Sequence, residues 1–91
     1  MPQVRATLII KGRVQGVFYR QSTKETAQSH NVSGWVRNLP NGNVEAVLEG
    51  LEQDVEHVIA WCWDGPPTAN VEDIIIEWNT STLEHSGFSI R

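Results

Sequence analysis

Gly12, Gly16 and Arg20 lie close together in residues 12–20, which run Gly-Arg-Val-Gln-Gly-Val-Phe-Tyr-Arg. Gly12 and Gly16 allow the backbone to turn so that consecutive N–H groups point to one place, and a helix that follows adds the positive end of its dipole. The guanidinium of Arg20 offers a planar set of donors that suits two phosphate oxygens. The segment lacks the Gly-Lys-Ser/Thr and Gly-x-Gly-x-x-Gly patterns of nucleotide sites, so it predicts a site for a small phosphate group. A glycine loop beside a solvated arginine explains the residues equally well.

Asn38 is the second candidate, because it ends the segment Gly34-Trp35-Val36-Arg37-Asn38. Its side-chain amide has both a donor and an acceptor, which suits holding a water molecule beside a bound phosphate. The turn signal Pro40-Asn41-Gly42 follows closely, however, and Asn is common where turns begin. The spacing alone therefore favours a turn residue over a catalytic one.

The elements that must position these residues begin with a strand at 4–11 and a glycine-bounded break at 12–16. A helix is predicted from about 20 to 30, with a weak apolar stripe of Tyr19, Thr23 and Ala27. Residues 31–34 end it, and a second strand starts at Trp35 and runs to Asn38. The return strand 44–49 places Val44, Ala46 and Leu48 on one face and Glu45 and Glu49 on the other, which completes a hairpin.

The second helix has the clearest pattern in the chain. Glu52 and Asp54 suit its positive first turn, and Gly65 with Pro66-Pro67 ends it. Its apolar positions follow helical spacing at Val55, Val58, Ile59 and Cys62. Residues 71–78 form a strand in which Ile74-Ile75-Ile76 indicates burial on both faces. A polar segment, 79–86, leads to a short last strand at 88–90.

The order β-α-β-β-α-β predicts an α+β, ferredoxin-like sandwich: an antiparallel sheet with a short fifth strand and two helices on one face. In that topology the first and third strands are central neighbours, and the second strand pairs with the third. The end of the second strand can therefore approach the first loop. Residues 1–91 are expected to form one domain. Because this fold hosts many functions, it does not name one.

Composition narrows the function classes. The chain has 91 residues, with 40% apolar and 20% charged, and a net charge of −4 that argues against general nucleic-acid binding. Residues 1–44 hold six Lys or Arg and one acid, whereas residues 45–90 hold ten acids and no Lys or Arg, so an anion site belongs in the first half. The single cysteine excludes an intrachain disulfide, and no signal peptide or membrane span is predicted. A cytoplasmic protein is the expectation.

The two candidate segments resemble the two signatures of the acylphosphatase family. Residues 12–20 are similar to its Gly-x-Val-Gln-Gly-Val-x-Phe/Tyr-Arg run, and Gly34 to Asn38, followed by Gly42, is similar to the second signature. Gly65-Pro66 and the closing Phe88-Ser89-Ile90 also fit. The resemblance covers essentially the whole chain, and two matching motifs in order are far more specific than either alone.

This resemblance implies a hydrolase that cleaves acyl phosphates to a carboxylate and inorganic phosphate. Arg20 and Asn38 would be catalytic, and the backbone N–H groups of Arg13, Val14, Gln15, Gly16 and Val17 would bind the phosphoryl group with Arg20. A carboxylate leaves readily, so the enzyme needs charge stabilisation and an aimed water rather than a strong acid. The acyl group is expected to be weakly recognised. One departure, Trp61-Cys62-Trp63-Asp64, is more aromatic and acidic than the family pattern and bears only on substrate preference.

No cofactor or metal is expected. The three histidines show no ligand spacing, and Cys62 lies in the apolar stripe of a helix, which favours a buried thiol over a nucleophile. The expected partners are a small acyl phosphate and its product, inorganic phosphate, without nucleic acid or membrane. A monomer is the default.

Three alternatives stay open. An RNA-recognition domain would need aromatic residues on its central strands, and the segment 44–49 has none. A regulatory domain that binds a ligand without catalysis fits the same fold. The chain also resembles the acylphosphatase-like module of larger carbamoyl-transferring proteins, although its length of 91 residues favours the small enzyme.

Overall fold

The structure is a computed structural model that describes residues 3–81 and 85–91. Within these residues, five strands and two helices follow the predicted order. They are β1 (Gln3–Arg13), α1 (Tyr19–Ser29), β2 (Ser33–Asn38), β3 (Val44–Leu51), α2 (Glu52–Asp64), β4 (Asn70–Thr80) and β5 (Phe88–Ile90).

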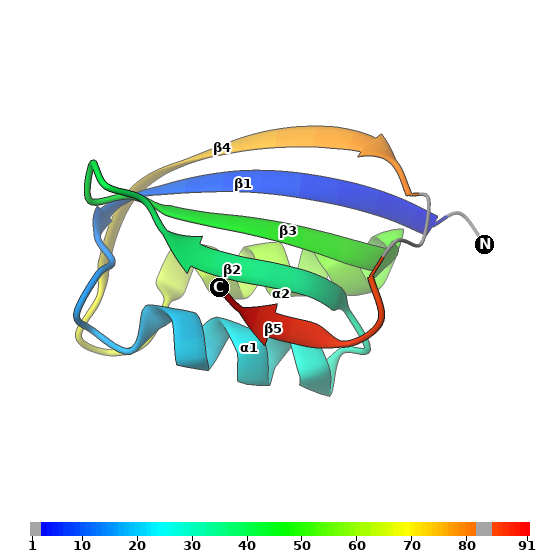
Figure 1. Cartoon of the computed structure of the whole chain (residues 1–91), viewed down its shortest axis with the longest axis horizontal. Helices are drawn as coiled ribbons and strands as arrows, with labels where there is room; N and C mark the ends of the chain where they lie inside the picture. Colours follow the sequence, from blue (N-terminus) through cyan, green and yellow to red (C-terminus); the bar gives the residue numbers. More distant parts are fainter. Residues whose placement is uncertain (1–2, 82–84) are drawn as a thin grey trace.

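The strands form one sheet in the order β4-β1-β3-β2-β5, and both helices cover the same face of it (Figure 1). β1 lies between β3 and β4 and is antiparallel to both, and β2 is antiparallel to β3. The predicted α+β, ferredoxin-like arrangement is therefore confirmed. The sheet is mixed rather than wholly antiparallel, because β5 runs parallel to β2 at the edge opposite β4.

The core lies between the sheet and the helices. Ala6, Leu8 and Ile10 on β1 pair with Leu48, Ala46 and Val44 on β3, and all six are fully buried. The predicted stripe of α2 (Val55, Val58, Ile59 and Cys62) is buried as well. Burial of these alternating and helical positions drives the association of the two layers.

The end of β1 differs from the prediction, because the strand continues through Gly12 to Arg13 instead of breaking at Gly12. Its pairing with β4 shifts register between Lys11 and Gly12. Gly12 has a φ of 124°, and a Cβ there would lie 2.2 Å from the carbonyl oxygen of Asn70. The glycine is therefore required for a bulge that bends the strand before the loop.

The interpretation of Ile74-Ile75-Ile76 as buried on both faces is wrong. Ile74 is buried on the helix side, but Ile75 is 51% exposed. β4 is an edge strand, and the helices cover only one face of the sheet, so the opposite face of β4 meets solvent. None of the helices within residues 3–81 and 85–91 has the length and apolar character needed to cross a membrane.

Candidate active site

A pocket of about 360 Å³ lies at the N-terminal end of α1. The loop from β1 to α1 and the ends of β2 and β5 meet there, at the left of Figure 1. Its walls come from all three segments. The lining residues are Val14, Gly16, Phe18, Tyr19, Arg20, Gln21, Asn38 and Ile90.

Tyr19 anchors the first turn of α1 to the end of α2. Its side chain is 1% exposed, and its hydroxyl donates a 2.7 Å hydrogen bond to the carbonyl oxygen of Cys62. Its ring packs against Trp61 with 5.6 Å between centroids. Burial and the neighbouring Cys62 raise the pKa of the Tyr19 hydroxyl far above its ordinary value, so the group stays a neutral donor. This anchor holds the backbone of Arg20 at the pocket.

The N-terminus of α1 is open to an anion. Phe18 occupies the N-cap position and provides no side-chain hydrogen bond to the helix, and no acidic residue lies in the first turn. The first N–H groups of a helix have no partner within the helix, and its dipole places positive potential there. Within the described residues, the guanidinium of Arg20 has no hydrogen bond or ion pair. Its charge is therefore available to a ligand.

Two buried valine side chains anchor the loop before α1 to the core. Val14 and Val17 are 1% and 5% exposed and enter the core, and the carbonyl oxygen of Val17 accepts a 3.2 Å hydrogen bond from Thr68. Gly16, between them, has a φ of 73°, a conformation that favours glycine. No atom of residues 3–81 and 85–91 lies within 4 Å of the position of its missing Cβ, so the backbone angle, and not space, requires glycine here.

Gln15 connects this loop to the turn between β2 and β3. Its Nε2 donates hydrogen bonds to the carbonyl oxygens of Leu39, at 2.7 Å, and Asn43, at 2.8 Å. Leu39 directly follows Asn38. The side chain of Gln15 thus couples the position of the loop to that of Asn38.

Asn38 is the last residue of β2, opposite Val44 of β3. Its Oδ1 is buried and has no hydrogen-bond partner among the described residues. Buried acceptors in proteins are nearly always paired with a donor from protein or water. An unpaired acceptor beside an anion pocket suits a site that receives a hydrogen-bond donor such as water.

The structure thus brings together Arg20 and Asn38, which come from different elements, along with Val14 and Gly16 of the expected phosphate loop. The other three expected loop residues do not line the pocket: Arg13 is exposed at the end of β1, Gln15 points to the β2–β3 turn, and Val17 is in the core.

Four lining residues, Phe18, Tyr19, Gln21 and Ile90, were not predicted as part of the site. Phe18 and Tyr19 lie in the signature segment 12–20 and Ile90 in the closing Phe88-Ser89-Ile90, but no pattern in the sequence marked any of them as a pocket residue.

Cys62 and the histidines, which were weighed above as a nucleophile and as metal ligands, do not line the pocket. Cys62 is fully buried, and burial raises the pKa of its thiol to about 12, as expected for a core residue. His30 and His57 come together, with ring centroids 5.4 Å apart, although they are distant in the sequence. Residues 3–81 and 85–91 contain no group of three or more metal-ligating side chains.

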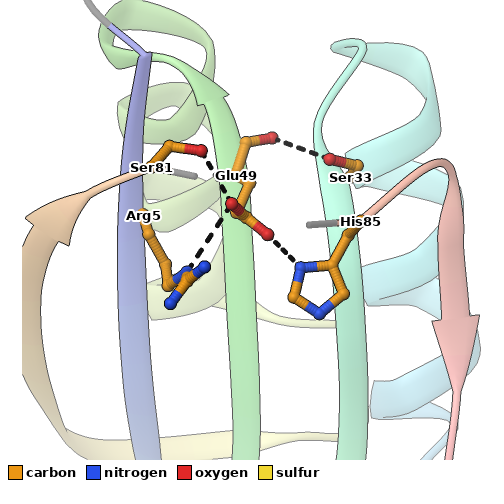
Figure 2. Close-up of polar contacts among 5 residues, drawn as sticks. All are labelled: Arg5, Ser33, Glu49, Ser81 and His85. Carbon is orange, nitrogen blue, oxygen red and sulfur yellow. Dashed lines mark hydrogen bonds and ion pairs between the residues drawn. The ribbon is translucent and has the colours of Figure 1, made fainter. Parts of the chain in front are cut away.

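A second polar cluster surrounds Glu49 at the other end of β3 (Figure 2). Glu49 is fully buried; its carboxylate pairs with His85, accepts a 2.7 Å hydrogen bond from Ser81 and lies 3.6 Å from Nε of Arg5. Burial alone would raise the pKa of Glu49, but these partners outweigh it and lower the pKa below 4.5. Val44, which pairs with the pocket residue Asn38, lies five residues before Glu49 on β3. At the rise per residue of a β-strand, this separation is roughly 17 Å, so the Glu49 cluster is remote from the pocket.

Known proteins that are similar in sequence and structure point to one family. The acylphosphatase family model matches residues 6–90. The chain is 44% identical over 90 residues to the acylphosphatase of Pelotomaculum thermopropionicum, covering 99% of this chain and 98% of that protein. It superimposes on the crystal structure of acylphosphatase from Bacillus subtilis with a TM-score of 0.93 at 33% identity, covering 97% of this chain and 98% of that one.

A larger protein contains a similar unit. The crystal structure of full-length HypF, in the phosphate- and nucleotide-bound form, matches all of this chain with a TM-score of 0.81 and 29% identity, but this match covers only 12% of that protein. The curated relative from Pelotomaculum and the Bacillus subtilis structure, by contrast, match over almost their whole lengths. On the family model, the identities and the fold, this chain belongs to the acylphosphatase family, hydrolases that act on acyl phosphates.

Proposed function

We propose that this chain hydrolyses small acyl phosphates by direct attack of water on phosphorus, with Arg20 and Asn38 as its catalytic residues. The observation that carries the proposal is that one pocket holds an unpaired guanidinium, an open helix N-terminus and an unpaired side-chain amide oxygen. The first two favour a phosphoryl group, and the third favours a water molecule beside it.

In this mechanism, the phosphoryl oxygens are bound by Arg20, by the N-terminus of α1, and by backbone N–H groups of the loop where Val14 and Gly16 line the pocket. The Oδ1 of Asn38 accepts a hydrogen bond from the water, which turns a lone pair of the water oxygen toward phosphorus. The bond from the water oxygen to phosphorus forms as the bond from phosphorus to the acyl oxygen breaks. The carboxylate departs, and both protons of the water end on inorganic phosphate. No covalent intermediate forms, and positioning with charge stabilisation supplies the catalysis.

The test is hydrolysis of benzoyl phosphate in excess chelator by wild type, Arg20→Ala and Asn38→Ala. Loss of the arginine should lower kcat/KM by about 10³-fold or more, as for other arginines in phosphoryl transfer. Loss of the asparagine should lower it by about 10²–10³-fold, as for other single positioned polar groups. Both variants should remain folded, because neither side chain is part of the core.

Lys24→Ala is the matched control. Lys24 is on α1 one turn after Arg20 and does not line the pocket, so the variant removes a positive charge from the same helix without touching the site. Its kcat/KM should stay within about twofold of wild type. A folded Arg20→Ala protein with wild-type turnover would overturn the proposal, as would activity that chelator removes.

A further inference from the structure

Two large apolar side chains are exposed at the pocket. Phe18 is 80% exposed and Ile90 is 37% exposed, and both line the pocket with Arg20 and Asn38. Of the large hydrophobic side chains exposed in the described residues, the other three, Trp63, Ile75 and Trp78, lie outside it. Exposed aromatic surface beside a polar site is typical of ligand contact.

The backbone directs Phe18 outward. Its φ is 63°, which is unusual for an aromatic residue, and such conformations cluster at functional sites. Val17 and Tyr19 on either side are buried, so the core holds both neighbours. With its neighbours held in this way, the ring of Phe18 is left in solvent at the mouth of the pocket.

Ile90 is held at the pocket by β5. It pairs with Val36 of β2, and the next N–H, from Arg91, donates a 2.9 Å hydrogen bond to the carbonyl oxygen of Val36. Val36 lies two residues before Asn38 on the same strand. The short last strand therefore fixes an apolar side chain next to the residue proposed to hold the water.

The substrate has two ends of different chemistry. If its phosphoryl group lies against Arg20 and the N-terminus of α1, its acyl group must extend away from them toward the pocket mouth. The large apolar side chains exposed at the pocket are those of Phe18 and Ile90, which line it with the exposed polar side chain of Gln21. An aromatic or branched acyl group would cover them and remove apolar surface from water, whereas an acetyl group is too small to do so.

We propose that Phe18 and Ile90 form an apolar rim that recognises the acyl group, so that this enzyme prefers aromatic and bulky aliphatic acyl phosphates to acetyl phosphate. The inference rests on the proposed function and replaces the expectation that the acyl group is weakly recognised. Phe18 and Ile90 are specificity residues in this proposal and take no part in the reacting bonds.

The kinetic test compares kcat/KM for benzoyl phosphate with kcat/KM for acetyl phosphate. Phe18→Asn removes the ring at a position where Asn tolerates the positive φ. The ratio of the two values should fall about tenfold in Phe18→Asn and by a smaller factor in Ile90→Ser, in line with the selectivity that one apolar contact supplies. Trp63→Asn, which removes an exposed aromatic outside the pocket, should leave the ratio at its wild-type value. An unchanged ratio in Phe18→Asn would overturn the proposal.

A binding test separates this inference from catalysis. Calorimetry with benzoylphosphonate and acetylphosphonate, whose phosphorus–carbon bonds are not hydrolysed, should show about tenfold tighter binding of the benzoyl compound by wild type, and Phe18→Asn should remove the difference. A wild-type protein that hydrolyses neither acyl phosphate but keeps this preference would refute the proposed function and support the rim. Equal affinity of wild type for both phosphonates would refute the rim whatever the turnover.

Discussion

The side-chain amide of Gln15 donates a 2.7 Å hydrogen bond to the carbonyl oxygen of Leu39, the residue after Asn38. The same nitrogen also reaches Asn43 at 2.8 Å. The segment proposed to bind phosphate and the residue proposed to hold the water thus belong to different parts of the chain but share a hydrogen-bonded connection. In-line attack depends on their relative position, since small displacements of reacting groups cost large factors in rate.

Gln15 should therefore affect catalysis without contacting the substrate through its side chain. Gln15→Met, which keeps the length but not the donors, should lower kcat/KM about tenfold and lower stability by about 1 kcal/mol. Gln15→Glu should be worse on both counts, because its carboxylate would face two carbonyl oxygens. Steady-state kinetics and urea unfolding measure the two effects.

Gln53→Met provides the control, since Gln53 is an exposed residue on α2. It should match wild type in both measurements. Gln15→Glu with activity equal to that of Gln15→Met would contradict the connection described for the amide.

Gly16→Ala should weaken the loop through its backbone. The φ of 73° costs a residue with a Cβ about 1–2 kcal/mol, although no atom in the described part of the chain blocks the methyl group. The unfolding free energy should fall by that amount and kcat/KM should fall with it. Gly87→Ala is matched, because Gly87 has a φ of 83° and equally open surroundings away from the pocket. It should lose similar stability and keep its activity; equal loss of activity in both variants would argue against a special role for the loop.

Glu49→Gln should lower stability in a pH-dependent way. The pKa of Glu49 in the folded protein lies below 4.5, its value in an unfolded chain, so its ionised form favours folding. That contribution is complete above about pH 4.5 and is lost as the pH falls through the lower, folded-state pKa. Removing the charge beside Arg5 and His85 should cost about 3 kcal/mol at pH 7.

Urea unfolding of wild type and Glu49→Gln between pH 7 and pH 3 measures this difference. It should shrink below pH 4.5, and kcat/KM should change little, because the cluster is remote from the pocket. A difference that stays constant over this range would show that the buried carboxylate is not the titrating group.

Cys62 should be inert in the folded protein. Its thiol is fully buried with a pKa of about 12, so little thiolate exists at pH 8 and none is accessible. Reaction with a thiol-specific disulfide reagent should be at least about 10²-fold slower in buffer than in denaturant. Cys62→Ala should cost about 1 kcal/mol of stability and leave kcat unchanged. Rapid labelling without denaturant would contradict the assignment of Cys62 to the core.

Local patterns predicted α2 well. The four positions of its predicted apolar stripe are all buried, and Gly65 ends it with a φ of 66° and an N–H bonded to the carbonyl oxygen of Trp61. Helical spacing and a glycine stop are properties of neighbouring residues, so the sequence contains them. The exposure of Ile75 was not predicted. A run of three isoleucines is typical of a strand that is covered on both faces, and the sequence does not reveal that β4 is an edge strand covered on one face only.

The order of the elements, the buried faces of β3 and α2, and the two segments in which Arg20 and Asn38 are proposed to act all follow from patterns along the chain. Folding brings these two residues to one pocket, connects their segments through Gln15, and exposes Phe18 and Ile90 at that pocket. It also buries Glu49 among Arg5, Ser81 and His85. The reason is physical: spacing along the chain reports local conformation, whereas these contacts join residues far apart in sequence. They depend on strand register, on which strands are edges and on which segments cover the sheet.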